Sequence, residues 1–363
     1  MQDIWTLPDL DKAQVSRIII TKTTGVGAIH ISGNTCIRNI FFWYPNQVTN
    51  SIPTAYPPTI LVSGDFTERI TIKDCCCGNA YYFIDATASH GSVQCDHVYG
   101  SPIYRFAQLA LCGGGDLFEF VDLWPLYTIT PYGNTLLSWI QENLIAFEVY
   151  RSDGIRFRNT NILDARYGML FHGTAAPEIS QCGFDAVLNP IYADTAAYNI
   201  HIVGCQLDSY RGWGTPLWPV GTTMVFIVGG YGHTIVGNMF RRCGGNGVTI
   251  WGGASDCVIS DNILPEFGKS ASGLNRGIVF EGSGSVISNN NLDAANAANS
   301  QGIYISGSDN TITGNSIKRI ANSAFELASG SAHNVVVGNN GKTTSGLLDS
   351  SGQTNEIAHN YWT

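Results

Sequence analysis

Six short segments in the C-terminal part of the chain share one pattern: an aliphatic residue, any residue, then Gly, Asp, Asn or His, then Asn. They are Ile235-Val-Gly237-Asn238, Ile259-Ser-Asp261-Asn262, Ile287-Ser-Asn289-Asn290, Ile312-Thr-Gly314-Asn315, Val336-Val-Gly338-Asn339 and Ile357-Ala-His359-Asn360. The repeated Asn recurs at steps of 24, 28, 25, 24 and 21 residues. Repeats of ~20–50 residues are typical of folds in which each unit buries its apolar face against the next unit.

A second repeat lies between these segments. Its members are Gly247-Val-Thr-Ile250, Gly277-Ile-Val-Phe280, Gly302-Ile-Tyr-Ile305 and Ala324-Phe-Glu-Leu327. All these runs are short and β-branched, which indicates strands rather than helices. Parallel strands stacked coil upon coil predict an all-β fold, a right-handed single-stranded parallel β-helix with loop insertions. Equivalent Asn side chains would then stack and hydrogen-bond along the ladder, and Asn also tolerates a left-handed turn.

The Asn column extends upstream with Cys at the same place, in Ile179-Ser-Gln181-Cys182 and Ile202-Val-Gly204-Cys205, and Cys75 is a candidate earlier member. One domain over residues 1–363 is expected, with residues 1–14 as a lead-in and coils from about Val15. Residues 93–150 break the period and are expected to form an irregular excursion. A short helix is predicted there after Asn134, because apolar residues at 136, 137, 140 and 144 have helical spacing.

Composition excludes several classes of protein. The net charge is −9 and no basic run is present, so nucleic acid is not expected as a partner. No apolar run reaches the ~18 residues of a membrane span, and the first residues lack the apolar core of a signal peptide. No cofactor is expected: Gly113-Gly-Gly-Asp116 lacks the Lys-Ser/Thr that follows a phosphate loop.

Ten cysteines are present but no CxxC pair, so the spacing argues against a zinc site and no metal is expected. Buried thiols that act as small apolar residues are the better interpretation. Free thiols predict folding in a reducing cytoplasm, whatever the final destination.

Several segments resemble a known group of proteins. They are Trp43-Tyr-Pro-Asn-Gln47, Val98-Tyr-Gly-Ser-Pro102, Leu123-Trp-Pro125, Ala146-Phe147 and Arg151-Ser-Asp153. Together they resemble the pectate-lyase-like β-helix proteins of bacteria and tailed phages, which include the tailspikes. The resemblance implies cleavage or binding of surface polysaccharide, often by a homotrimer. The calcium cluster of pectate lyases and the Asp-Asp pair of polygalacturonases have no matching residues in this sequence. The resemblance therefore does not imply pectin chemistry.

Candidate catalytic carboxylates follow from aligning the coils on the Asn/Cys column. The residue after the next apolar position should turn outward, which gives Asp185, Asp208 and then Arg241, with Asp164 one coil earlier and Glu266 at a similar place. Neighbouring coils are ~4.8 Å apart. Glycosidases need carboxyl pairs ~5–5.5 Å apart for retention or ~6.5–9.5 Å for inversion. The alternative is a set of solvated turn residues, since Asp is common in turns.

An aromatic insertion at 209–221 lies between the Asp208 and Arg241 coils. Its Tyr210, Arg211, Trp213 and Trp218 are expected to stack on sugar rings or hold a sugar acid, unless the Trp side chains pack against the solenoid or a second subunit. Arg241 and Arg242 would bind an acidic sugar or pair with Asp208. Tyr167 and His172 complete the candidate substrate-binding residues, although an isolated His is commonly just a hydrogen-bonded side chain.

These features predict an enzyme that degrades a bacterial surface or extracellular polysaccharide, with hydrolysis favoured over elimination. A polysaccharide lyase with Arg241 or a Tyr as base is the first alternative. A non-catalytic glycan-binding or structural tail protein is the second, because an aromatic groove alone would suffice. A virion tail or extracellular location is expected, with a polysaccharide as substrate and no membrane partner.

Overall fold

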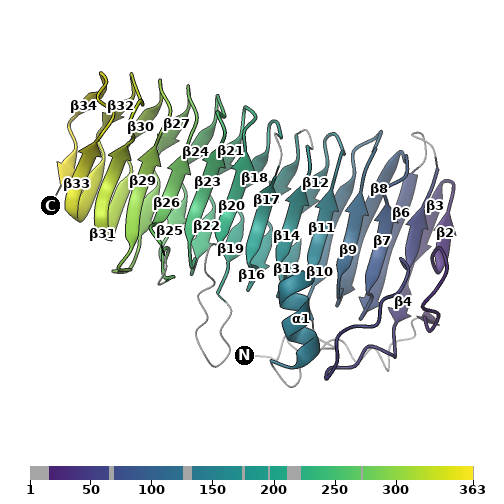
Figure 1. Cartoon of the computed structure of the whole chain (residues 1–363). Helices are drawn as coiled ribbons and strands as arrows, with labels where there is room; N and C mark the ends of the chain where they lie inside the picture. Colours follow the sequence, from purple (N-terminus) through teal and green to yellow (C-terminus); the bar gives the residue numbers. More distant parts are fainter. Residues whose placement is uncertain are drawn as a thin grey trace.

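The computed structural model describes residues 16–64, 69–125, 133–173, 176–194, 197–210, 222–270 and 273–362, with the side chains of 342–345 left aside. The described chain is a right-handed parallel β-solenoid of about 13 turns. Its strands join into one sheet system of parallel pairs that winds around a single axis. Figure 1 shows the coils stacked in chain order from purple to yellow, with α1 beside them. The predicted fold class is confirmed.

Each turn contributes strands to three rows. The first row stacks β3 (Thr35–Arg38), β6 (Arg69–Gly78), β8 (Ser92–Gly100), β10 (Leu117–Leu123), β12 (Arg156–Arg158), β15 (Glu178–Ser180), β18 (His201–Val203), β21 (Thr234–Val236), β24 (Val258–Ser260), β27 (Val286–Ser288), β30 (Thr311–Thr313), β32 (Val335–Val337) and β34 (Glu356–Ala358).

The second row runs through the later parts of β6, β8 and β10. Its other strands are β1 (Ser16–Ile19), β4 (Ile40–Trp43), β13 (Asn161–Leu163), β16 (Gly183–Asp185), β19 (Gln206–Asp208), β22 (Met239–Arg241), β25 (Ile263–Leu264), β28 (Asn291–Asp293), β31 (Ser316–Leu327), β33 (Asn340–Asp349) and β35 (Tyr361–Trp362).

The third row ends on the later parts of β31 and β33. It stacks β2 (Ile29–Ile31), β5 (Ile60–Val62), β7 (Tyr82–Ala86), β9 (Arg105–Leu109), β11 (Ile145–Val149), β14 (Tyr167–Phe171), β17 (Asn189–Ala193), β20 (Thr223–Val228), β23 (Asn246–Trp251), β26 (Asn275–Phe280) and β29 (Ser300–Ile305).

The core lies inside the coil and consists of apolar columns that follow the strand register. In the first row Phe157, Ile179, Ile202, Ile235 and Ile259 pair in sequence, and each is at most 1% exposed. Because strand side chains alternate between faces, the intervening residues point to solvent. The outer face of each row is therefore the surface on which a functional site can lie.

The Asn column forms the predicted ladder at the corner between the first and second rows. Each side-chain amide from Asn238 to Asn339 donates to Oδ1 of the Asn one coil further on, at 2.9–3.0 Å. The left-handed residue is the one before each Asn, with φ between 53° and 67°. This explains Gly, Asp, Asn or His at that position, since these residues adopt positive φ most readily.

The upstream cysteines continue this column, as predicted. The backbone N–H of Cys205 donates to Oδ1 of Asn238 at 2.8 Å. Cys205 Sγ lies 3.6 Å from the carbonyl of Ile179, the position that the Asn amide takes in later coils. All ten cysteines are free thiols, eight of them buried, in agreement with the expectation of buried thiols.

The excursion expected over residues 93–150 is much shorter than predicted. Strands β8, β9, β10 and β11 all pair in register with coils on both sides. Among the described residues of this range, the departure lies between the end of β10 and the start of β11, and it contains α1 (Thr135–Asn143). The side chain of Asn134 caps α1 by accepting from the N–H of Leu137 at 2.9 Å, which confirms the predicted helix.

Candidate functional site

The corner after the second row brings together part of the predicted carboxylate column. Asp208 pairs with Arg241 in the parallel ladder, and Phe184 pairs with Leu207, which places Asp185 beside Asp208. The predicted stack of Asp185, Asp208 and Arg241 on three successive coils is therefore correct. Arg241 is exposed, and the exposed fraction of the Asp185 side chain is 57%.

Asp164 and Glu266 do not belong to this stack. Leu163 takes the position beside Asp185, so Asp164 lies one residue further along, with φ 56°, 1% exposure and its carboxylate held by Gln141 at 2.6 Å. Glu266 is shifted in the same way, because Leu264 pairs with Leu292. A shift of one residue turns a strand side chain to the other face.

Asp208 is not an exposed corner residue, contrary to the prediction. It is 1% exposed. Its Oδ1 accepts the N–H of Tyr210 at 3.0 Å, and its Oδ2 accepts two N–H groups of Arg242, Nε at 2.6 Å and Nη2. Burial raises the pKa of Asp208, and the bonds from Tyr210 and Arg242 oppose that rise. The carboxylate is thus fully engaged within the protein.

Arg242 contacts Asp185, Asp208 and Tyr210, and we call these four residues the corner cluster. Its Nη2 lies 3.6 Å from Oδ1 of Asp185, and its guanidinium lies 4.9 Å from the centre of the Tyr210 ring. Of the two alternatives predicted for Arg242, the structure shows the pairing with Asp208. The other predicted members of the aromatic insertion, Arg211, Trp213 and Trp218, lie outside the described residues.

A cavity of about 310 Å³ adjoins Asp185 on the outer face of the second row. Trp124, Asn161, Gly183 and Gln206 contribute to its wall. Gly183 lets the Asn161 side chain lie against its backbone, because a Cβ at this position would lie 2.4 Å from Oδ1 of Asn161. Among the described residues that line the cavity, Asp185 is the only carboxylate, since Asp208 does not line it.

A second polar cluster lies on the outer face of the third row, and we call it the His172 centre. Nδ1 of His172 is 2.8 Å from Oδ2 of Asp194, and Nε2 is 3.5 Å from Oε1 of Glu148. Arg105 donates to Oε2 of Glu148 at 2.5 Å, and the Tyr150 hydroxyl donates to Oε1 at 3.2 Å. The Tyr150 ring stacks on His172 with centroids 4.5 Å apart.

The charged groups of the His172 centre stabilise one another in their charged forms. Burial alone raises the pKa of Glu148, but His172 and Arg105 outweigh it and hold that pKa below its usual value. The contact with Glu148 raises the pKa of His172; burial opposes this, and Asp194 adds to it. Glu148 is 6% exposed in its side chain, whereas Asp194 is 38% exposed. Asp194 is therefore the carboxylate that a solvent-borne substrate can reach.

A row of aromatic rings continues from the His172 centre along the same face. Tyr167 and Tyr192 have centroids 5.4 Å apart, Tyr192 and Phe226 stack at 4.5 Å, and Phe226 meets Trp251 at 5.4 Å. Glu148 lies in the same outward column as Tyr192 and Phe226, because Leu170 pairs with both Glu148 and Tyr192. Trp251 is 47% exposed. Half-exposed rings suit stacking on sugar faces.

Sequence reasoning named Tyr167 and His172 but missed Glu148, Asp194 and Arg105. These residues carry no repeated letter, since each coil has a different side chain at the outward position of the third row. A usable signal was the alternation in Ala146-Phe-Glu-Val149 and Gly168-Met-Leu-Phe171, which fixes the outward positions once the strands are aligned. One group of described residues could hold a metal ion: His90, Cys112 and Asp116.

Comparison with known proteins agrees with the fold. Residues 217–361 match the family model described as a right handed beta helix region. No curated protein matches the chain. None of the described helices has the length and apolar character needed to cross a membrane.

Solved structures with a similar chain include three proteins. The periplasmic alginate epimerase AlgG is 11% identical over 85% of this chain and 77% of its own, with a TM-score of 0.49. The GH136 lacto-N-biosidase from Eubacterium ramulus is 10% identical over 84% and 62%, with a TM-score of 0.47. Tailspike protein 3 of bacteriophage CBA120 is 12% identical over 96% and 56%, with a TM-score of 0.47.

Proposed function

We propose that this protein is a polysaccharide-degrading enzyme that cleaves its substrate on the outer face of the third row. The observation that carries the proposal is the His172 centre, an acid-base cluster of two carboxylates around one imidazole, at the end of a row of partly exposed aromatic rings. An extended glycan lying on Tyr192, Phe226 and Trp251 would reach Asp194 directly.

Hydrolysis is the reaction we favour. Asp194 would take a proton from the attacking water and return it to the leaving oxygen as the glycosidic bond breaks. His172 is a positioning residue in this scheme, because both of its ring nitrogens face carboxylates. Glu148 stays anionic and keeps the imidazole charged. Groups that differ in charge state at one pH are the usual requirement for acid-base catalysis.

Elimination is the second candidate, and Tyr150 favours it. Burial raises the pKa of Tyr150, and the nearby Glu148 carboxylate adds to the rise. The hydroxyl therefore keeps its proton and can donate it to the leaving group, while Asp194 would take the proton from the carbon beside the uronate carboxyl. Arg105 and His172 supply positive charge that would stabilise a uronic acid carboxylate. This reaction requires a uronate-containing substrate, whereas hydrolysis does not.

The corner cluster remains a second proposed location for hydrolysis. Asp185 lines a cavity and contacts Arg242, so it could act on a substrate that enters there. Asp208 would then serve mainly to fix Arg242. We place this cluster after the His172 centre because it presents one accessible carboxylate, and the sugar-stacking residues expected beside it are outside the described residues.

The test is a panel of neutral and uronate-containing polysaccharides, assayed for new reducing ends and for near-ultraviolet absorbance of unsaturated sugars. Hydrolysis gives reducing ends without that absorbance, and elimination gives both. Asp194→Asn should lower kcat by ~10²–10⁴-fold, the usual contribution of general acid-base catalysis. Its substrate affinity should change little, because the aromatic row is intact.

Asp309→Asn is the matched control. Asp309 also lies near a histidine, with Oδ1 3.5 Å from His333, but it is 66% exposed and far along the chain from the centre. It should keep full activity. Full activity in Asp194→Asn would rule out the His172 centre as the catalytic site, and Asp185 would become the next candidate. Glycan binding without cleavage of any substrate would support the non-catalytic alternative instead.

A further inference from the structure

A second, separate group of chemically active side chains lies inside the solenoid, at the corner between the third and first rows. His90, Cys112 and Ser152 form parallel bridges with one another on three successive coils. Asp116 joins them from the Gly113-Gly-Gly-Asp116 turn. Gly115 has φ 76°, and a Cβ on Gly114 would lie 2.7 Å from the carbonyl of Gly91, so this turn needs glycine.

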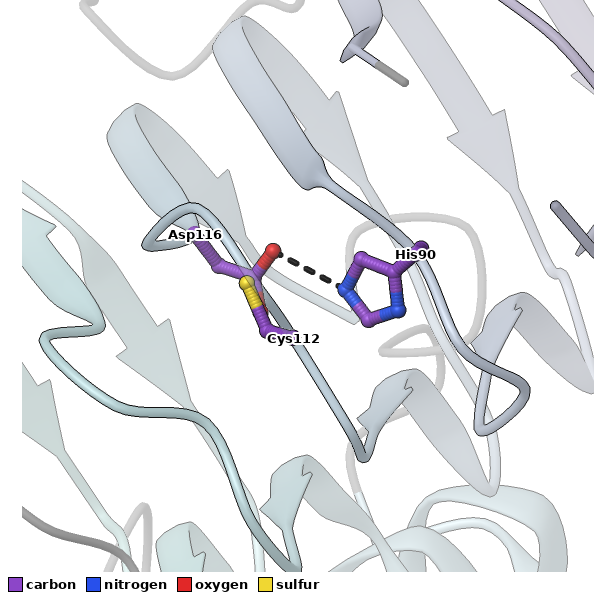
Figure 2. Close-up of side chains that lie close together, drawn as sticks. All are labelled: His90, Cys112 and Asp116. Atoms are coloured by element: carbon purple, nitrogen blue, oxygen red, sulfur yellow. Dashed lines mark hydrogen bonds and ion pairs between the residues drawn. The ribbon is translucent and has the colours of Figure 1, made fainter. Parts of the chain in front are cut away.

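The donor atoms of three of these residues converge on one point. A ring nitrogen of His90, Sγ of Cys112 and a carboxylate oxygen of Asp116 all lie within 4.8 Å of one another, and Nε2 of His90 is 3.1 Å from Oδ1 of Asp116 (Figure 2). His90 and Asp116 are 0% exposed, whereas Cys112 is partly exposed. Cys112 therefore marks the side from which an ion could enter.

Two of the donors, His90 and Asp116, are also held from behind. Nδ1 of His90 lies 3.0 Å from the carbonyl of Ala88, which leaves Nε2 facing the group. Asp116 accepts the N–H of Val93 at 2.8 Å and the Ser152 hydroxyl at 2.9 Å, one on each oxygen. The Cys112 thiol donates to the carbonyl of Gly91 at 3.2 Å, a bond that it would give up as a thiolate. Outer contacts like those of His90 and Asp116 orient metal ligands in proteins.

We propose that His90, Cys112 and Asp116 bind one zinc-type divalent cation that clips neighbouring coils together. Nitrogen, sulfur and carboxylate donors in a tetrahedral arrangement suit Zn²⁺, whereas Ca²⁺ and Mg²⁺ require oxygen ligands. The fourth position would be filled by water from the Cys112 side. The residue spacings of 22 and 4 are unlike those of zinc motifs, which is why the sequence argued against a metal here.

Charge balance permits the exchange of two protons for one divalent cation inside the fold. Without metal, the His90 imidazolium and the Asp116 carboxylate neutralise each other. Nε2 of His90 and Oδ1 of Asp116 lie 3.1 Å apart, the distance of a direct ion pair. On binding, Nε2 and Sγ each release a proton, and thiolate plus carboxylate then balance the two charges of the ion. Both states are neutral overall, as a buried site requires.

The experiment uses the full chain after treatment with a chelator. Zn²⁺ is titrated calorimetrically, and Co²⁺ is titrated by absorbance, because a cobalt thiolate gives a near-ultraviolet charge-transfer band. One equivalent should bind with that band present. Cys112→Ala should abolish the band and weaken Zn²⁺ binding at least ~100-fold, and Ser152→Ala should weaken it ~10–100-fold through the loss of an outer contact.

Cys36→Ala is the matched control, because Cys36 is an exposed thiol elsewhere on the chain and should leave binding unchanged. Cys112 is partly exposed, so Cys112→Ala is expected to fold, and circular dichroism checks this. Absence of binding, or equal binding by wild type and Cys112→Ala, would overturn the proposal. The group would then be only a buried His90–Asp116 ion pair.

Discussion

His172 shows how single residues on this solenoid acquire a function from their neighbours in adjacent coils. Its imidazole lies between Glu148 from one coil and Asp194 from another. Neither carboxylate is near His172 in the sequence, and the parallel register alone brings them together. Since coils are ~4.8 Å apart, residues separated by one period come within direct contact. The chemistry of the centre therefore depends on which residues the stacked coils place side by side.

A pH dependence of stability follows from the two shifted pKa values. His172 has a raised pKa, so its contribution is fully present below the unfolded value of ~6.5 and is lost as pH rises through the folded value. Glu148 has a lowered pKa, so its contribution is present above ~4.3 and is lost as pH falls through its folded value. The pair should stabilise the protein most between about pH 4.3 and 6.5.

Thermal unfolding of wild type and His172→Gln at several pH values measures this contribution. The difference in Tm should be largest near pH 5.5, within the window set by ~4.3 and ~6.5, and should shrink at alkaline pH. His333→Gln is the control, because His333 is 71% exposed and should give a small difference. A Tm difference for His172→Gln that does not vary with pH would contradict the assignment of a charged imidazole.

The sequence could place some of these residues and not others, for a physical reason. Asp185 and Asp208 follow a repeated apolar residue, so counting from the Asn/Cys column located both. Asp164 follows two apolar residues, Ile162 and Leu163, and only the observed register shows that Leu163 takes the outward position. The burial of Asp208 was not predicted, because pairing with Arg242 one coil away was only one of two alternatives for that arginine.

The corners between strands stabilise this fold as well as the strands do, and the Asn ladder is the corner with the most complete hydrogen bonding. Asn290 illustrates its bonding: Nδ2 donates to Ile259 O and to Asn315 Oδ1, and Oδ1 accepts from the backbone and side chain of Asn262. The residue is 0% exposed. Every polar atom of its amide is thus used, which explains why the same letter recurs in each coil.

Replacing Asn290 with Ala should lower the free energy of unfolding by ~1–3 kcal/mol, because buried donors and acceptors lose their partners. Chemical denaturation monitored by circular dichroism measures the change. Asn291→Ala is the control, since Asn291 is the next residue but is exposed, and it should change stability by less than ~0.5 kcal/mol. Equal effects of the two changes would mean that the ladder contributes nothing specific.

A second ladder was missed although its signal is present. Asn310, Asn334 and Asn355 each lie five residues before a member of the first ladder, and their side chains bond in the same way at 3.0 and 3.1 Å. Upstream, Ser285 takes the same position and accepts from Cys257 N–H. The change from Asn to Ser hides the repeat, because different side chains satisfy one backbone requirement.

The strand pairing is quasi-one-dimensional, since each described strand pairs only with strands of the neighbouring coils. In such solenoids stability is roughly a sum of local terms, and damage in one region need not spread. Trp362 provides a place to test this. Its ring lies 5.4 Å from that of Phe325 and covers Gly341 and Gly346, whose added Cβ atoms would meet it at 2.8 and 2.6 Å.

Trp362→Ala should uncover the apolar interior at the last described coil. A fully buried Trp contributes ~3–5 kcal/mol relative to Ala, and Trp362 is half-buried, so a local loss of ~2 kcal/mol is expected. Hydrogen exchange should accelerate in β33, β34 and β35 but not in β14 or β17. Activity at the His172 centre should stay unchanged, because many coils separate it from Trp362. Faster exchange in all strands alike would show that the solenoid unfolds as one cooperative unit, and the one-dimensional description would then fail for this chain.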